Sequence, residues 1–382
     1  MSTKSIFIAG AGGIGQATAL ILCEYNSVMD VIVYLGDISE NALKNSKSFV
    51  IDGCSHEAKV HTVLMPKSGS SEELDAVLEK CDVILDCLPG SQAPRMARLA
   101  LDHKCHYANL TEYVKETNEI IAMSKDADTA FVLQTGLAPG FINVLACQLY
   151  DKFKAEYGNN MLERMTMKVG AVTPHGTAPH YYAFTWSPIG VATEYLKDAI
   201  VVKNYKTESV PALSGRETIY INGKEYEDNF TSGGAADLPI AFEGKIKDLD
   251  YKTLRLPGHY GWVDEVLDAI PEGENRIQAL ERTMLEQVPS AEDDVVIVYA
   301  SVEGKDEYGR LRKIEKAYEV KPSKVGNKFL RAIQSTTAAP LCEVARLMIE
   351  KNWRGTVLQS QIDPESFMNG PYVSAIYGSN GL

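Results

Sequence analysis

The sequence lacks three features that would place the protein in a membrane, on nucleic acid or in a disulfide-bonded scaffold. No apolar segment approaches the roughly 20 residues that a helix needs to cross a bilayer. No cluster of basic residues stands out, and 38 basic against 51 acidic residues give a net charge of −13. Nucleic acid and anionic membranes are therefore not expected partners.

The seven cysteines are scattered and never spaced as CxxC. An odd number without such spacing argues against a disulfide framework and a zinc site, so we expect no metal and a reducing cytoplasm. Residues 1–4 and the apolar run behind them could imitate a signal peptide, but three glycines interrupt that run, and we expect a first strand instead. At 382 residues the chain is long enough for two domains.

The most informative stretch is a glycine-rich turn between two apolar runs. Residues 5–9 predict a parallel strand covered on both faces, and they lead into Gly10-Ala11-Gly12-Gly13-Ile14-Gly15. This string fits the dinucleotide fingerprint: Gly10 permits the tight turn, Gly12 lets a pyrophosphate approach, and Gly15 lets helix pack on strand. The helix that starts near Ile14 would direct its amide end at the phosphates.

An acidic residue closes the second apolar run at the expected distance. Asp37 follows Gly15 by 22 residues. A carboxylate there accepts hydrogen bonds from the adenosine ribose and repels a 2′-phosphate, which favours NAD over NADP. The alternative is a glycine turn that binds no nucleotide, but strand, glycines, helix, second strand and acid occur in the expected order.

Helices and strands continue to alternate up to residue 134, which is typical of a doubly wound parallel sheet. Because ligands bind beyond the carboxyl ends of such strands, Leu88-Pro89-Gly90 is expected to lie over the cofactor near its nicotinamide, the alternative being a simple turn. Asn109, Thr111 and Glu112 follow the next strand. They are candidates for contact with substrate or nicotinamide, although Thr111 and Glu112 could merely cap the next helix. Helices are expected over 40–50, 72–80, 93–102 and 114–125, and strands over 60–65, 83–87, 105–108 and 130–134.

After about residue 163 the hydrophobic period changes, and few helices separate the middle strands. This pattern predicts a mixed or antiparallel sheet in an α+β substrate domain. We expect residues 138–335 to form this domain as an insertion into an NAD-binding domain of residues 1–137 and 336–382. A helix over 341–351, capped by Thr336 or Thr337 with Pro340 in its first turn, would return the chain to the nucleotide domain. Strands are expected over 165–171, 199–203, 217–221, 251–256 and 295–302.

Three segments of this second domain carry side chains that a small polar substrate could use. Tyr182 and Trp186 are aromatic candidates, although with Phe184 they could equally form one packed face of a strand. The glycines of residues 231–234 would let amides approach an anion. Arg255 alternates with apolar neighbours and must find a carboxylate, from the protein or from a substrate. His259 is suited to proton transfer near neutral pH, although a lone histidine is more often structural.

Taken in order, these motifs resemble the saccharopine dehydrogenase family, and within it the NAD-dependent lysine 6-dehydrogenase branch. The likeness covers nearly the whole chain. Where this branch usually has Asp-Leu-Thr-Glu, the chain has Asn109; if an acid there recognises an amine or removes a proton, the amide would indicate another substrate. The matching motifs are the glycine turn with residues 35–37, then residues 88–90, 109–112, 136–141, 184–188, 231–234 and 253–259.

The resemblance implies a Rossmann domain with an inserted α+β domain, a homodimer, and hydride transfer to NAD from a carbon that bears nitrogen. For lysine, the deprotonated ε-amine would lose hydride from its ε-carbon, and the imine would hydrolyse to a semialdehyde that cyclises. The alternatives are a reductase that joins an amine to a semialdehyde, and an NAD-binding homologue without turnover. The expected residues are Gly10, Gly12, Gly13, Ile14, Gly15, Asp37, Leu88, Pro89 and Gly90 for NAD, Arg255, Asn109, Tyr182 and Trp186 for substrate, and His259 and Glu112 for proton transfer.

Overall fold

The computed structural model describes residues 3–112, 114–158, 162–378 and 380–381. The chain divides into two compact units, each built on its own sheet. The first unit consists of Met1–Phe141, Ser323–Leu330 and Gln334–Ser379, and the second of Ile142–Pro322, Arg331–Ile333 and Asn380–Leu382.

The first unit contains a seven-stranded parallel sheet in the order β17-β6-β5-β4-β1-β2-β3. The winding reverses between β1 and β4, and ligands of such sheets bind outside the carboxyl ends of the strands at this point. The predicted doubly wound sheet is therefore confirmed. Its strands are β1 (Lys4–Ala9), β2 (Val31–Asp37), β3 (Val60–Leu64), β4 (Val83–Asp86), β5 (His106–Asn109), β6 (Ala130–Val132) and β17 (Gly355–Val357).

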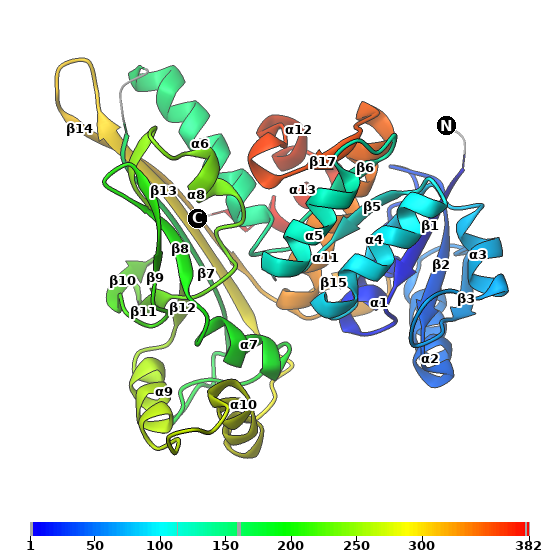
Figure 1. Ribbon diagram of the computed structural model, residues 1–382, viewed down its shortest axis with the longest axis horizontal. Helices are drawn as coiled ribbons and strands as arrows, with labels where there is room; N and C mark the ends of the chain where they lie inside the picture. Colours follow the sequence, from blue (N-terminus) through cyan, green and yellow to red (C-terminus); the bar gives the residue numbers. More distant parts are fainter. Residues whose placement is uncertain (1–2, 113, 159–161, 379, 382) are drawn as a thin grey trace. The chain divides into compact units, whose positions relative to one another are not determined.

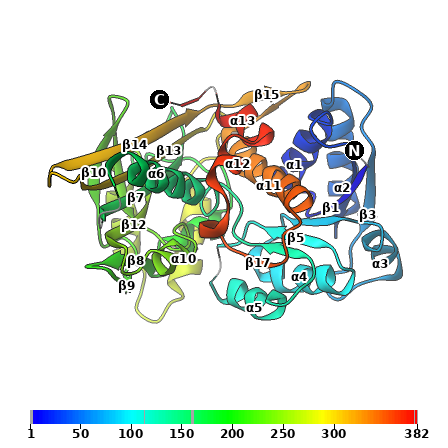
Figure 2. The same cartoon turned by 90° about the horizontal axis from the view of Figure 1, so that it is seen from above.

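Helices cover both faces of this sheet. Figure 2 shows α1, α2 and α11 on one side of the strands and α3, α4 and α5 on the other, where they enclose a core that includes Phe7, Tyr107 and Phe131. Ser39 and Ser71 cap α2 and α3, because their hydroxyls accept from Ala42 N and Leu74 N. The helices are α1 (Gly13–Glu24), α2 (Glu40–Gly53), α3 (Glu72–Leu78), α4 (Ala93–Asp102), α5 (Val114–Ser124), α11 (Ala332–Lys351), α12 (Pro364–Met368) and α13 (Pro371–Tyr377), with short 3-10 turns at Gly90–Gln92 and Gln359–Gln361.

A small hairpin from late in the chain also belongs to the first unit. It consists of β15 (Ser323–Val325) and β16 (Lys328–Leu330). Asn327 N donates to Gly53 O over 2.6 Å, and Asn327 Nδ2 donates to Cys54 O over 3.3 Å. The hairpin is thereby fastened to the end of α2.

The second unit contains a mixed sheet in the order β10-β11-β12-β7-β13-β14, with β8 and β9 attached beside β12. Its central strand β7 runs parallel to β12 and antiparallel to β13, which confirms the predicted mixed sheet. Helices α7, α9 and α10 gather at one end of this unit (Figure 1). The strands are β7 (Leu162–Val172), β8 (Ala199–Lys203), β9 (Lys206–Val210), β10 (Glu217–Ile221), β11 (Lys224–Phe230), β12 (Ile246–Arg255), β13 (Val295–Lys305) and β14 (Leu311–Val320), and the helices are α6 (Phe141–Tyr157), α7 (Pro188–Glu194), α8 (Leu238–Ala241), α9 (His259–Asp268) and α10 (Arg276–Gln287).

The start of α11 corrects a prediction. The helix begins at Ala332, so Thr336 and Thr337 are not its caps, and Pro340 lies inside it. Asp294 supplies the cap instead: its two carboxylate oxygens accept from Ala332 N and Ile333 N, each over 2.7 Å. Because this acid lies far away in the sequence, no local capping pattern could reveal the true start.

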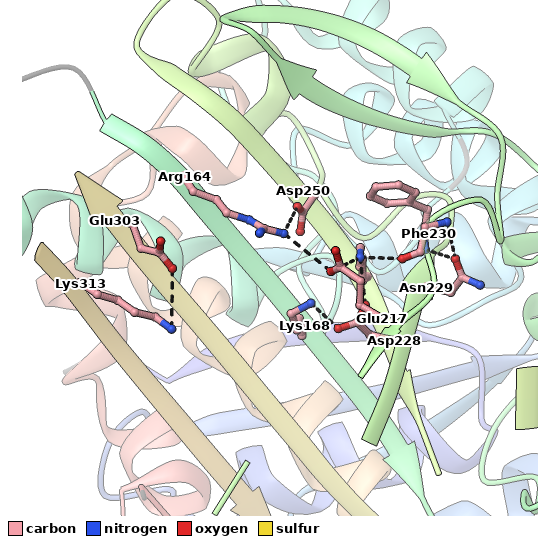
Figure 3. Close-up of polar contacts among 11 residues, drawn as sticks. Arg164, Lys168, Glu217, Asp228, Asn229, Phe230, Asp250, Glu303 and Lys313 are labelled. Carbon is pink, nitrogen blue, oxygen red and sulfur yellow. Dashed lines mark hydrogen bonds and ion pairs between the residues drawn. The ribbon is translucent and has the colours of Figure 1, made fainter. Parts of the chain in front are cut away.

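An ion network crosses the second sheet (Figure 3). Lys168 on β7 and Lys252 on β12 are direct register partners, and both are buried. Asp228 on β11 pairs with both lysines, with 3.0 Å between its Oδ1 and Lys252 Nζ. Lys252 Nζ also lies 2.6 Å from Glu217 Oε2 on β10, so the network connects four strands.

Candidate dinucleotide and substrate sites

Of the three fingerprint glycines in this turn, the fold itself needs Gly10 and Gly15 but not Gly12. Gly10 has φ +100°, and a Cβ on it would lie 3.0 Å from Cys87 O. A Cβ on Gly15 would lie 1.9 Å from Gly10 O, which no adjustment of a side chain could relieve. A Cβ on Gly12 would meet nothing within 4 Å. The open space beside Gly12 therefore fits the pyrophosphate that the fingerprint predicts.

Asp37 is held against this turn. It ends β2, and its Oδ2 accepts from Ala11 N over 2.8 Å, while its Oδ1 accepts from Ser39 N over 2.9 Å. These two amides fix the carboxylate beside the turn and the start of α2. This is the position from which an acid reaches the ribose hydroxyls of a bound dinucleotide.

The corner after β4 lies next to the same turn. Cys87 N donates to Ala9 O over 2.8 Å, and the side chain of Leu88 approaches Gly10. Pro89 then precedes a 3-10 turn that begins at Gly90 and leads into α4. The structure therefore brings together the glycine turn, Asp37 and the corner Leu88-Pro89-Gly90, as a dinucleotide site requires.

Asn109 is enclosed by the protein. Its side chain is 1% exposed, its Oδ1 accepts from Gln134 N over 2.9 Å, and its Nδ2 donates to Tyr107 Oη over 3.4 Å. Both ends of the amide are thus engaged, and contact with a substrate stays a prediction. Glu112 is half-buried in the segment between β5 and α5, and its role in proton transfer also stays a prediction.

Arg255 has a protein partner. The guanidinium is 2% exposed at the end of β12, and its Nη2 lies 3.1 Å from Glu194 Oε1. Its Nε donates to Tyr195 Oη over 2.6 Å, and its Nη1 donates to Leu254 O over 3.0 Å. The sequence predicted that Arg255 pairs with a carboxylate, either from the protein or from a substrate. In the structure, the protein supplies one through Glu194.

His259 lies in the same cluster as Arg255 and is completely buried. Its Nδ1 is 2.7 Å from His180 O, so Nδ1 carries the proton, because a carbonyl oxygen can only accept. Its Nε2 therefore accepts from Tyr195 Oη over 2.9 Å. Burial, and then the charge of Arg255, lower the pKa of His259 to about 3. The ring is neutral with both nitrogens engaged, which is the arrangement of an anchoring group; proton transfer by His259 stays a prediction.

Tyr182 and Trp186 belong to an irregular segment rather than a strand. Tyr182 packs in a core with Phe184, and its ring centroid lies 4.9 Å from Arg255 Cζ. A Cβ on Gly190 would lie 2.4 Å from the ring of Trp186, so that glycine makes room for the indole. These contacts give both aromatic residues a packing role, and contact of either residue with a substrate stays a prediction.

The glycines at residues 233 and 234 also have a structural reason. Gly233 has φ +88°, and a Cβ on Gly234 would lie 2.2 Å from the ring of Tyr251. Ser232 N donates to Glu194 O over 3.1 Å, which occupies one of the amides that an anion could use. The glycines are thus explained by the backbone and by the neighbouring ring, and anion binding here stays a prediction.

Comparisons with known proteins identify the family. Residues 6–134 match the model for the saccharopine dehydrogenase NADP binding domain, and residues 136–374 match the saccharopine dehydrogenase C-terminal domain. The chain belongs to the saccharopine dehydrogenase family. It is 24% identical to alpha-aminoadipic semialdehyde synthase of Rattus norvegicus over 212 residues, and 24% identical to that of Arabidopsis thaliana over 256 residues. These matches cover 55% and 63% of this chain but only 22% of each relative.

Two solved structures share the fold of this chain. Apo saccharopine dehydrogenase (L-Glu forming) from Saccharomyces cerevisiae superposes with a TM-score of 0.72 at 14% identity, covering 98% of both chains. Homospermidine synthase from Legionella pneumophila, in complex with NAD, gives 0.65 at 13% identity, covering 99% of this chain and 91% of that one. The saccharopine dehydrogenase fold therefore accounts for both sheets, and the family points to an NAD(P)-dependent oxidoreductase.

Four residues that organise these sites had no role assigned from the sequence: Asp86, Tyr107, Glu194 and Tyr195. An acid at the end of the apolar run 83–86 was the available signal for Asp86, since a buried carboxylate needs partners. Among the described residues, no group of three or more His, Cys, Asp or Glu side chains could hold a metal ion. Nor does any described helix have the length and apolar character to span a membrane.

Proposed function

We propose that this protein is an NAD-dependent dehydrogenase that oxidises an amine-bearing carbon of an amino acid, with the ε-amine of L-lysine as the first candidate. The carbon–nitrogen chemistry is supported by the names of the relatives. Oxidation of the lysine ε-carbon followed by hydrolysis gives the semialdehyde of α-aminoadipate, the compound named in the synthases of rat and Arabidopsis thaliana. The bound nicotinamide would supply the hydride acceptor.

The single observation that carries the choice of NAD is the position of Asp37. Its carboxylate lies at the end of β2, bound to Ala11 N of the glycine turn. A 2′-phosphate at the ribose would meet this negative charge, whereas ribose hydroxyls would donate to it. NAD is therefore favoured, although the family model is described as NADP binding.

Oxidation of an amine requires a base, because a protonated amine cannot release hydride. Such a group typically contributes ~10²–10⁴-fold to the rate. We propose Glu112 for this role in preference to His259. Glu112 is half-buried beyond β5, while burial holds His259 neutral with both nitrogens bound to protein groups.

The second candidate is a reductase that joins an amine to a semialdehyde. The observations in its favour are the NADP description of the family model and the names of the two similar structures. A preference for NADPH and turnover in the reductive direction alone would support this function.

Two glycine variants test dinucleotide binding. Gly12→Ala should leave the melting temperature within about 2 °C of the wild type and weaken NADH binding at least tenfold, because the added methyl occupies only the space beside the turn. Gly15→Ala is the matched control and should lower the melting temperature, since its Cβ meets Gly10 O. Unchanged NADH binding in Gly12→Ala, measured by fluorescence titration, would contradict a dinucleotide at this turn.

Cofactor choice and substrate are tested separately. Asp37→Ala should lower the ratio of NAD to NADP affinity by about tenfold, and an unchanged ratio would contradict the role of Asp37.

The substrate test follows NADH formation from NAD with L-lysine at mildly alkaline pH, with saccharopine, diamines and other amino acids as controls. A signal with lysine alone supports lysine oxidation, while silence despite NAD binding would redirect the search to other amines.

A further inference from the structure

A directional chain of hydrogen bonds runs through the first unit at the carboxyl ends of β4 and β5. Asp86 and Asn109 are register partners on these strands, and both are buried. Tyr107 lies between them: its Oη donates to Asp86 Oδ2 over 2.8 Å and lies 3.4 Å from Asn109 Nδ2. Its ring is fixed by contact with Phe131, whose centroid is 5.6 Å away.

The direction of each bond follows from the groups at the two ends of the chain. Gln134 N can only donate, so the oxygen of the Asn109 amide faces it, and the amide nitrogen must face Tyr107 Oη. Tyr107 Oη has two acceptors within reach, Asp86 Oδ2 at 2.8 Å and Ala93 O at 3.2 Å, and its proton is directed to the nearer of them, the carboxylate of Asp86. The other oxygen of Asp86 accepts from Leu88 N over 3.0 Å.

This chain connects two segments that the proposed function uses. Leu88 begins the corner beside the glycine turn, and Asn109 begins the segment that ends at Glu112. We propose that Asp86, Tyr107 and Asn109 are positioning residues that fix these two segments relative to each other, and that Asn109 acts through this chain rather than by touching a substrate. The inference rests on the proposed function only for the identity of the groups that the two segments bind.

This arrangement requires a donor at residue 109, and an amide supplies one at every pH. An ionised aspartate there could not donate to Tyr107, and it would place a second buried carboxylate beside Asp86. A protonated aspartate could still donate, so Asn109→Asp should retain the chain at low pH and break it as the pH rises. The titratable and charged groups around the chain are Asp86, Tyr107, the Cys87 thiol and Arg95 on α4, and burial raises the pKa of Asp86 to about 6.

The first readout does not need turnover. Hydrogen exchange followed by mass spectrometry would report the protection of the Leu88 amide in the wild type, Tyr107→Phe and Asn109→Asp. Tyr107→Phe keeps the packed ring and removes only the hydroxyl, so it should speed exchange at Leu88 at least fivefold. Exchange at Ala42, whose amide is bound by Ser39, is the internal control and should not change.

The second readout is the pH profile. NADH affinity, and kcat/KM for any amine that is turned over, are measured for Asn109→Asp and for the wild type. The ratio of variant to wild type should fall at least tenfold between pH 6 and pH 9 for each quantity. A ratio that rises with pH, or a gain confined to KM for the amine, would overturn the inference and place residue 109 in contact with substrate. Unchanged protection at Leu88 in both variants would also overturn it, while absence of turnover would count only against the proposed function.

Discussion

The two sheets place their buried polar groups differently. In the first unit the interiors of β2, β4 and β5 are apolar, and the half-buried Asp37 and the buried Asp86 and Asn109 lie at the ends of these strands. In the second unit Lys168 and Lys252 lie within their strands, on a face of the sheet. A parallel sheet that is covered by helices on both faces accommodates charged groups mainly at the ends of its strands. Polar residues at these strand ends are therefore the better candidates for function.

The ion network of the second sheet has a structural explanation. Lys168 and Lys252 are register partners, and like charges directly opposite each other destabilise a pair of strands. Asp228, which pairs with both, allows this register to exist. We therefore expect Asp228 to act on stability, and the polar chain of the first unit to act on binding and turnover.

The largest expected effect is that of Asp228→Asn. Removing the charge leaves two buried lysines without their shared partner, which should cost about 3–5 kcal/mol in the free energy of unfolding. Urea denaturation that follows the unfolding of the second unit measures this loss of free energy. The control is Glu303→Gln on the same sheet, whose partner Lys313 is 3.7 Å away at the surface, with an expected loss below about 1 kcal/mol.

A triple variant sharpens this prediction. Lys168→Met, Lys252→Met and Asp228→Leu together remove the central charges, so most of the stability lost in Asp228→Asn should return. If Asp228→Asn alone unfolds at the urea concentration of the wild type, the explanation of the network fails, and the lysines must obtain their compensation elsewhere.

The next effect is a dependence on pH with opposite signs in the two units. His259 has a pKa of about 3 in the folded protein, against about 6.5 when unfolded. Between these values the unfolded chain binds the extra proton, so the stability present above pH 6.5 is lost as the pH falls, by roughly 3 kcal/mol at pH 4. Burial raises the pKa of Asp86 to about 6, so its contribution is lost as the pH rises from about 4 through 6.

His259→Gln isolates the first of these contributions. Glutamine can donate and accept as the neutral ring does, but it cannot become charged. The difference in unfolding free energy between the wild type and this variant, measured from pH 4 to pH 8, should therefore shrink on the acidic side. A constant difference over that range would mean that His259 is not held neutral by its surroundings.

Local sequence was sufficient for the dinucleotide-binding part of the first unit. The order of apolar run, glycines, helix, second run and Asp37 is encoded within 33 residues, and each signal has a local physical cause. The mixed second sheet could also be predicted, but β9, β11 and β14 could not. Their sequences are rich in charged and polar residues and resemble loops, and only pairing with neighbouring strands makes them regular.

The site residues show where local signals end. Arg255 was correctly expected to need a carboxylate, but Glu194 lies 61 positions away, and no pattern connects the two. Asn109 donates to Tyr107 and accepts from Gln134 N, which lies just after β6 and 25 positions along the chain. The start of α11 depends on Asp294 in the same way. In each case a long-range contact decides the role of a residue whose type alone leaves several roles open.

The smallest expected effect is that of Glu208→Gln, which removes an ion pair from the hairpin of β8 and β9. Glu208 Oε1 lies 3.4 Å from Lys203 Nζ, and both side chains are 46% exposed. Water solvates both charges whether or not they pair, so the loss should be below about 0.5 kcal/mol and should vanish in 0.5 M salt. Urea denaturation of Glu208→Gln and of Asp228→Asn, measured side by side, compares an exposed with a buried ion pair of the same sheet. A loss above about 2 kcal/mol would contradict the expectation that burial decides which ion pairs stabilise this sheet.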